Sequence, residues 1–196
     1  ELYNVSLDLA YDFLNFPNLE YLIYKWDKSC RNLSSLSKLK ELSLWSYKST
    51  SKDMTDFSGF CDLEELRIIQ SNVASIKGIE SLKNLKDIIF IANRDMSLKG
   101  IDSVFKEVDS LHIEGCKNID DSFVKIFPNV KRLEFINNAE LESLRNILEG
   151  LKQLEYLNVA GTKILEEDNW YWKDFTSIKA FNFTDRKHHK MKLSDL

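Results

Sequence analysis

The chain has 196 residues, of which 43% are hydrophobic and 30% charged, with 27 basic residues against 31 acidic ones. This weak and mixed net charge of −4 argues against a nucleic-acid partner and against an anionic membrane surface. No apolar run approaches the roughly 20 residues that a membrane-spanning helix needs, and three widely spaced cysteines argue against a disulfide framework.

One nine-residue pattern recurs along nearly the whole chain, and each copy predicts a short strand. Each copy has apolar residues at its first, fourth and sixth places, and its ninth place is usually polar or small. The copies are LEYLIYKWD (19–27), LKELSLWSY (39–47), LEELRIIQS (63–71), LKDIIFIAN (85–93), VDSLHIEGC (108–116), VKRLEFINN (130–138), LEYLNVAGT (154–162) and IKAFNFTDR (178–186). Their first residues lie 20 to 24 positions apart. A partial copy, LYNVSLDLA (2–10), opens the chain with Leu2 at its first place.

The segments between these strands carry apolar residues at helical or three-residue spacing. Such spacing predicts return segments that close the other side of a core. A single repeat cannot bury its own apolar face, so the stacked copies must share one continuous core. The clearest examples are Val73, Ile76, Ile79 and Leu82 in one segment and Leu141, Leu144, Leu148 and Leu151 in another.

This pattern resembles the leucine-rich repeat, whose period is 20–29 residues and whose core reads L-x-x-L-x-L-x-x-N/C-x-L. The resemblance implies an α/β solenoid, a leucine-rich-repeat horseshoe with a parallel concave β-sheet of about eight or nine short strands. Helical or 3-10 segments are expected on the convex side. The 22-residue unit 63–84 is similar to the short, internalin-like bacterial style of repeat. We expect one domain over 1–196, with an irregular first repeat or cap at 1–18, eight repeats at 19–186 and a C-terminal tail at 187–196.

The ninth place has its own role in this family, where a buried Asn bonds to the loop backbone of the neighbouring repeat. Asn93 and Asn138 match that pattern, whereas Tyr47 and Arg186 depart from it. Tyr47 leads into the polar stretch 48–56, which we interpret as a solvated loop.

The same alignment predicts which side chains point away from the core, namely those at the third, fifth and seventh places. Adjacent strands lie about 4.8 Å apart, so the seventh-place residues Trp45, Ile69 and Ile91 should touch in sequence. Together with Ile89 they form what we call the apolar ridge. At the third place, Glu41, Glu65 and Asp87 form a run of like charges that we call the acid column.

Large exposed apolar patches usually mark interaction sites, so the sequence predicts a protein-binding surface on the concave face. Like charges on adjacent strands repel each other, which favours a partner with a basic patch. Strand propensity alone, a covering terminal segment, or ordinary solvation of the acids would explain the same residues without a partner. The predicted contact residues are Tyr21, Ile23, Glu41, Trp45, Glu65, Arg67, Ile69, Asp87, Ile89, Ile91, His112, Glu114 and Ile136.

Catalytic and cofactor motifs such as GxSxG, HExxH, a P-loop or GxGxxG in a nucleotide-binding context are absent from the sequence. His112 lies near Glu114 and Glu134, an arrangement open to proton transfer or metal binding, but we interpret it as a surface contact. We assign His188 and His189 to a solvated tail, and we expect the aromatic run NWYWKDF (169–175) to fill the convex side of the last repeat. The sequence therefore predicts no enzyme, no cofactor and no metal.

These expectations favour a non-catalytic protein-recognition module. By family resemblance, one role is an intracellular immunity protein that neutralises a toxin or effector. Other roles that stay open are the repeat region of a bacterial surface adhesin, the scaffold of a larger enzyme, and self-association through the ridge. The few cysteines favour the cytoplasm. Glu1 stands where an initiator Met is expected, which leaves a secreted or cell-surface location open.

Overall fold

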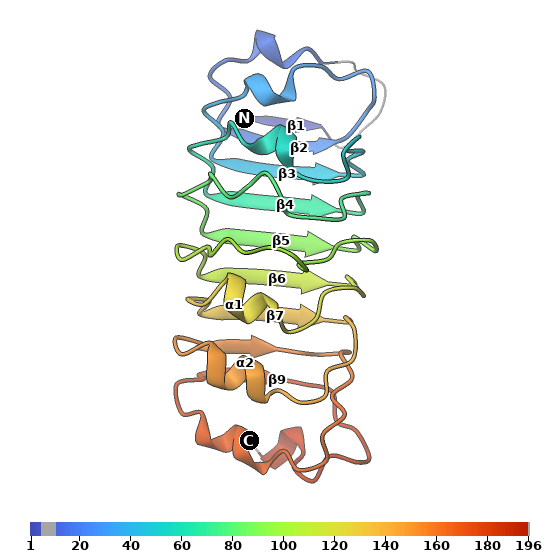
Figure 1. The fold of residues 1–196 in the computed structure, drawn as a ribbon, viewed down its shortest axis with the longest axis vertical. Coiled ribbons are helices and arrows are strands. Elements are labelled where there is room, and N and C mark those ends of the chain that lie inside the picture. Colours follow the sequence, from blue (N-terminus) through green and yellow to red (C-terminus); the bar gives the residue numbers. More distant parts are fainter. Residues whose placement is uncertain (5–10, 196) are drawn as a thin grey trace.

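Nine parallel strands form one sheet in the computed structural model, which describes residues 1–4 and 11–195. The strands follow one another across the sheet in chain order (Figure 1). They are β1 (Leu2–Asn4), β2 (Tyr21–Lys25), β3 (Glu41–Trp45), β4 (Glu65–Ile69), β5 (Asp87–Ile91), β6 (Ser110–Glu114), β7 (Arg132–Ile136), β8 (Tyr156–Asn158) and β9 (Ala180–Asn182). The predicted solenoid with a parallel sheet is confirmed.

Short helical segments return the chain from the end of one strand to the start of the next. The helices α1 (Phe123–Ile126) and α2 (Arg145–Gly150) lie over the same face of the sheet (Figure 1). The 3-10 helices of the described residues are Phe13–Asn15, Leu33–Ser35, Thr55–Phe57, Trp170–Asp174 and Leu193–Asp195. None of the helices in residues 1–4 and 11–195 combines the length and apolar character needed to cross a membrane.

The core lies between the sheet and these return segments, and its composition follows from the pleat of the strands. Successive side chains of a strand point to opposite faces, so the fourth and sixth places of each copy face the same way. In β4, for example, Leu66 and Ile68 have no exposed surface, and the first-place residue Leu63 before them has none either. Ile76 and Ile79 close this layer from the return segment. The face of the sheet turned away from this core is the predicted concave face.

The pairing register places equal positions of neighbouring copies side by side from β2 to β9. Trp45 on β3 lies opposite Ile69 on β4, which lies opposite Ile91 on β5. The partial copy at the start of the chain differs, because Leu2 lies opposite Leu22 and therefore occupies the fourth place. Our alignment of that copy is wrong by three residues. The first and fourth places both face the core, so an apolar residue fits either; residues 5–10 lie outside the described part.

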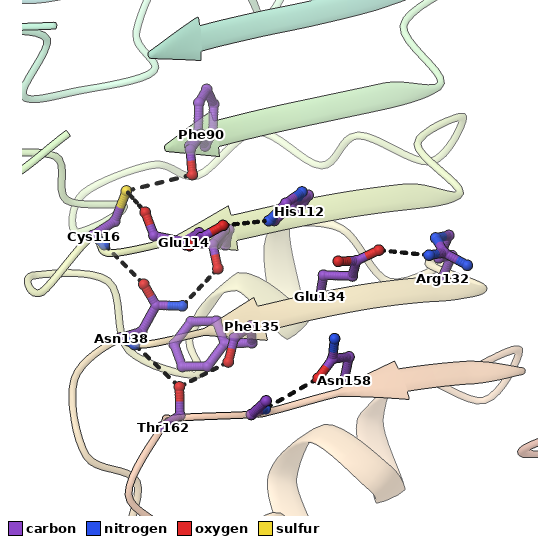
Figure 2. A network of polar contacts seen from close by, with 12 residues as sticks. Phe90, His112, Glu114, Cys116, Arg132, Glu134, Phe135, Asn138, Asn158 and Thr162 are labelled. Atoms are coloured by element: carbon purple, nitrogen blue, oxygen red, sulfur yellow. Dashed lines mark hydrogen bonds and ion pairs between the residues drawn. The ribbon is translucent and has the colours of Figure 1, made fainter. Parts of the chain in front are cut away.

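The ninth-place ladder predicted from the sequence is present between β6 and β8 (Figure 2). Asn138 Oδ1 accepts a hydrogen bond from the Cys116 backbone N–H at 2.8 Å, and its Nδ2 donates to the Ile113 carbonyl at 2.7 Å. Thr162 Oγ1 accepts from the Asn138 backbone N–H at 3.1 Å and donates to the Phe135 carbonyl at 2.7 Å. The buried loop backbone is thus satisfied by side chains of the following repeat.

Tyr47 fills a ninth place without breaking this ladder. Its backbone N–H donates to Ser71 Oγ at 3.1 Å, as the pattern requires. Its ring is buried against Trp26 and Phe57, with ring centroids 4.9 and 5.2 Å away, and its hydroxyl donates to Asp56 at 2.5 Å. An aromatic side chain therefore replaces the amide by packing into the core.

The stretch 48–56 after Tyr47 is not simply solvated, and that part of the prediction is wrong. Ser49 and Met54 are buried. The Ser49 N–H donates to Asn72 Oδ1 at 2.8 Å, and the Met54 N–H donates to the Lys77 carbonyl at 2.8 Å. Bonds to the next repeat therefore hold the loop against the solenoid.

The end of the chain packs onto the last repeat, so the prediction of a solvated tail is wrong for His189 and Met191. His189 is 3% exposed, and its ring lies 5.7 Å from that of Trp172 and 6.0 Å from that of Phe183. Met191 exchanges two backbone hydrogen bonds with the side chain of Asn169, at 2.8 and 3.1 Å. A terminal repeat has no neighbour on its outer side, so this segment covers its apolar surface.

Candidate protein-binding surface

The apolar ridge crosses β3, β4 and β5 at their carboxyl ends. Trp45 keeps 40% of its surface exposed, and Ile89 and Ile91 are half-buried. Ile69 lies between Trp45 and Ile91 in the sheet and is only 7% exposed, so our expectation that it is exposed is wrong. Ile69 has a large side chain on either side, Trp45 on β3 and Ile91 on β5, and strands about 4.8 Å apart leave a residue between two such neighbours little exposed surface. The accessible part of the ridge is therefore Trp45 with the two isoleucines of β5.

The acid column lies beside this ridge at the amino ends of the same strands. Glu41 lies opposite Glu65, and Glu65 lies opposite Asp87. Arg67 forms an ion pair with Glu65 from the same strand, so one of the three charges is compensated within the chain. Within residues 1–4 and 11–195, Glu41 and Asp87 have no ion-pair partner. Both acids line a shallow hollow of about 230 Å³, which Tyr21 also borders.

The electrostatic environment of Asp87 is unfavourable for its charge. Burial raises the pKa of this carboxyl above its ordinary value, and a hydrogen bond with Ser110 offsets part of the rise. The carboxylates of Glu65 and Asp109 raise the pKa further, whereas the guanidinium of Arg67 lowers it. A cation placed in the hollow would relieve this repulsion.

The C-terminal half of the concave face differs because its polar groups satisfy one another. Arg132 Nη2 lies 2.6 Å from Glu134 Oε1, an ion pair visible in Figure 2, and its guanidinium stacks 3.8 Å above the Tyr156 ring. Asn182 Nδ2 donates to Asn158 Oδ1 at 3.1 Å. These side chains are therefore paired with one another within the chain, whereas Glu41 and Asp87 of the N-terminal half have no ion-pair partner among the described residues.

His112 borders both regions, because it lies directly opposite Ile89 of the apolar ridge. Its Nε2 lies 3.3 Å from Glu114 Oε2 (Figure 2), and Glu134 is its neighbour on β7. No group of three or more His, Cys, Asp or Glu residues that could hold a metal ion occurs in the described part of the chain. The nearby Cys116 faces the core, where burial raises the pKa of its thiol to about 11 and keeps it protonated. Nε2 of His112 is itself buried and accepts or donates no hydrogen bond among the described residues, so Glu114 is its only polar neighbour of opposite charge there.

The remaining predicted contact residues fall into two groups. Tyr21 and Ile23 lie half-buried on β2, opposite Glu41 and Ser43 of β3, and extend the N-terminal surface. Ile136 is half-buried on β7, and Glu114 separates it from the apolar ridge. The structure therefore brings twelve of the thirteen predicted residues together on β2 to β6, with His112 opposite Ile89 and Glu114 opposite Ile91, and places Ile136 one strand further.

Our alignment overlooked three charged residues that border the same hollow. Lys40, Glu64 and Lys86 occupy the second place of their copies and line the hollow beside the acid column. Lys40 Nζ lies 3.0 Å from Glu20 Oε2, and Lys86 Nζ lies 2.7 Å from Glu64 Oε2. A signal for them was present, because every second place of the eight copies carries a charge.

Comparison with known proteins gives likenesses of structure only. No family model matches the sequence, and no curated protein matches it significantly. An internalin (inlF) from Listeria monocytogenes has a TM-score of 0.64 at 13% identity, over 95% of this chain and 57% of that one. The leucine-rich repeat domain of the type III effector XopL has a TM-score of 0.55 at 19% identity, over 74% of this chain and 51% of that one. Internalin C2 from Listeria monocytogenes has a TM-score of 0.50 at 13% identity, over 77% of this chain and 74% of that one.

The chain thus spans little more than half the length of the first two of these structures. At such low identity the likeness concerns the fold alone. Parallel strands stacked in chain order, apolar first, fourth and sixth places, and a ninth-place hydrogen-bond ladder agree with it. The chain is a leucine-rich-repeat solenoid.

Proposed function

We propose that this chain is a non-catalytic recognition module that binds a protein partner through the N-terminal half of its concave face, on β2 to β5. The observation that carries the proposal is the apolar ridge, where Trp45 is 40% exposed beside half-buried Ile89 and Ile91. A soluble protein seldom leaves such residues together on a surface without a use for them. Tryptophan and arginine are also the residues most enriched at the energetic centres of interfaces, and Arg67 lies on the neighbouring strand.

The charge of this surface defines the kind of partner. Glu41 and Asp87 have no compensating ion pair within residues 1–4 and 11–195, and Asp87 is held near two other carboxylates. A partner with Lys or Arg beside an apolar segment would neutralise the acid column while covering the ridge. The leucine-rich-repeat fold, shared with internalins and with an effector domain, supports a role in protein recognition in general.

Two finer roles fit a binding face of this kind, and they make different predictions. An immunity-type inhibitor in the cytoplasm must occlude a toxin or effector, so binding should abolish that partner's activity. The repeat region of a surface adhesin should bind its partner without inhibiting it and should be found outside the cell.

Photo-crosslinking from the hollow beside the acid column tests the proposal directly. A photoreactive phenylalanine analogue replaces Tyr21, beside the acid column, and in a matched control it replaces Trp170, which is exposed on the last repeat. In cells of the source organism, we expect a discrete adduct from the first position and none from the second. The same experiment in a Trp45→Ala, Ile91→Asp background should lose the adduct while the circular dichroism spectrum stays unchanged.

The outcomes of this experiment are separable. An adduct that survives the double substitution in a folded protein would refute the assignment of the surface. An adduct with twice the mass of the chain would show that the partner is a second copy.

A further inference from the structure

The second places of the eight copies carry charges of strictly alternating sign, which we call the charge column. Each of these residues directly precedes its strand, from β2 to β9, along the edge of the sheet where the strands begin. The neighbouring third-place column does not alternate, because it contains Glu41, Glu65 and Asp87 in succession. The members of the charge column are Glu20, Lys40, Glu64, Lys86, Asp109, Lys131, Glu155 and Lys179.

These charges form ion pairs between adjacent repeats. Each lysine side chain contacts the acid of the preceding repeat. The backbone follows the same order, because from Lys40 to Lys179 the N–H of each second-place residue donates to the carbonyl of the second-place residue in the preceding repeat. The Nζ-to-carboxylate distances are 3.0 Å for Lys40–Glu20, 2.7 Å for Lys86–Glu64, 3.3 Å for Lys131–Asp109 and 2.7 Å for Lys179–Glu155.

The attraction also continues between one pair and the next. Lys86 lowers the pKa of Glu64 first by its hydrogen bond and charge, and Lys40 on the other side lowers it further. Glu64 in turn raises the pKa of Lys86, and Asp109 of the following repeat adds to that rise. An interior member of the column therefore has a favourable neighbour on both sides.

Stability alone does not explain this arrangement. The paired side chains are 43–73% exposed, and ion pairs with such exposure contribute little to the free energy of folding. The first, fourth and sixth places, by contrast, are apolar in every repeat, so the apolar pattern by itself does not distinguish the correct neighbour from another repeat. Misassembly is a characteristic failure mode of repeat proteins.

We propose that the charge column favours pairing of adjacent repeats during folding and disfavours two alternatives, pairing with the second repeat along and pairing with the same repeat of a second copy. Pairing a repeat with the next one brings opposite charges together at the entry of the strands. Skipping one repeat, or pairing a repeat with its counterpart in a second copy, brings like charges together. Like charges directly opposite each other on adjacent strands are destabilising. The device lies on the strand-entry edge and does not depend on any partner of the concave face.

Three variants of equal net charge test the proposal. The scrambled variant, Lys40→Glu with Glu64→Lys, creates two like-charge junctions without changing the composition of the column. The neutral variant, Lys40→Gln with Glu64→Gln, removes attraction and repulsion together. The inverted variant reverses all eight charges and restores the alternation: Glu20→Lys, Lys40→Glu, Glu64→Lys, Lys86→Glu, Asp109→Lys, Lys131→Glu, Glu155→Lys and Lys179→Glu.

Each variant is refolded from urea, and the yields of native monomer and of associated species are measured by size-exclusion chromatography. At low salt, we expect the scrambled variant to give at least about threefold less monomer than the parent chain, with dimers in its place. The neutral variant should lie between them, and the inverted variant should refold like the parent. At about 1 M salt, where the Debye length is about 3 Å, the differences should disappear.

The proposal fails if the scrambled variant refolds like the parent or if the inverted variant gives as little monomer as the scrambled one. It also fails if high salt does not restore the monomer yield of the scrambled variant. Equilibrium unfolding of the purified monomers separates selection from ordinary stability. A scrambled variant that loses equilibrium stability but reaches full monomer yield would show ordinary ion pairing and overturn the inference.

Discussion

Ile69 lies directly opposite Trp45 in the parallel pairing of β4 with β3, and the two differ sharply in exposure, at 7% and 40%. Trp45 thus forms the accessible end of the apolar ridge. Truncating it would remove this exposed surface and one of the two large neighbours of Ile69. This relationship makes Trp45 the residue whose substitution reports most directly on the proposed surface.

Association with the partner should slow as salt rises. The acid column attracts a basic surface over a distance of the order of the Debye length, and that attraction is screened by ions. Between 50 and 500 mM salt, we expect the association rate constant in stopped-flow measurements to fall about tenfold. The Glu41→Gln, Asp87→Asn variant should show a flatter dependence. A parent rate that is independent of salt would remove the acid column from the recognition mechanism.

Asp87→Asn should stabilise the folded chain at neutral pH while weakening partner binding. Burial raises the pKa of Asp87 in the folded state, so its stabilising contribution is present at low pH and is lost as the pH rises through that pKa. The amide removes this cost, and because the group is only half-buried, the gain is up to about 1 kcal/mol after screening by solvent.

Urea unfolding of Asp87→Asn and the parent chain at pH 4 and pH 7 measures this effect. The difference in unfolding free energy should be larger at pH 7. A variant that is less stable than the parent at pH 7 would contradict the electrostatic description of the hollow.

Asn93→Ala should be strongly destabilising. Asn93 has no exposed surface, its Oδ1 accepts from the Ser71 N–H at 2.9 Å, and its Nδ2 donates to the Ile68 carbonyl at 2.7 Å. Alanine would leave two buried backbone groups unpaired, at a cost of about 2–4 kcal/mol in unfolding free energy. Gln153→Ala, at an exposed site, is the control and should change stability little.

A second pair of substitutions, at Asn138, tests whether hydrogen bonding or packing decides the ninth place. Thr162 already makes both ladder bonds with its hydroxyl, so Asn138→Thr should lose much less stability than Asn138→Ala. Equal losses for the two variants in urea unfolding would show that packing, rather than hydrogen bonding, decides this position.

The C-terminal segment should loosen as the pH falls. Burial lowers the pKa of His189 in the folded state, and the nearby charges of His188 and Lys192 lower it further, against opposing effects of the Ile164 carbonyl and Glu166. The unfolded chain therefore binds the proton more readily, and stability declines as the pH drops below about 6.5 toward the folded pKa.

Hydrogen exchange of the segment 185–195 at pH 7.5 and pH 5.5 measures this loosening. After correction for the intrinsic exchange rate at each pH, we expect lower protection factors at the lower pH in the parent chain and a smaller change in His189→Phe, which keeps an aromatic ring against Trp172. An acid-induced loss of protection of equal size in both proteins would exclude His189 as its cause.

Most of the fold could be predicted from the sequence because the same pattern occurs in eight aligned copies. An apolar first, fourth and sixth place defines which side chains enter the core, and the outward columns then follow from the pleat. Trp45, Ile69 and Ile91 were placed side by side in this way, and the pairing of β3, β4 and β5 confirms it. The alignment of Leu2 failed because a single partial copy cannot distinguish two inward places.

The sequence by itself determined the stacking, the register of the repeats and the residues that face away from the core, since a period repeated along the chain leaves only one consistent alignment. Only the tertiary structure decided that Ile69 is covered, that Tyr47 packs as a core side chain, and that His189 closes the last repeat. Exposure depends on the size of the neighbours across the sheet and on what covers an open end. Those contacts form between residues that no local pattern connects.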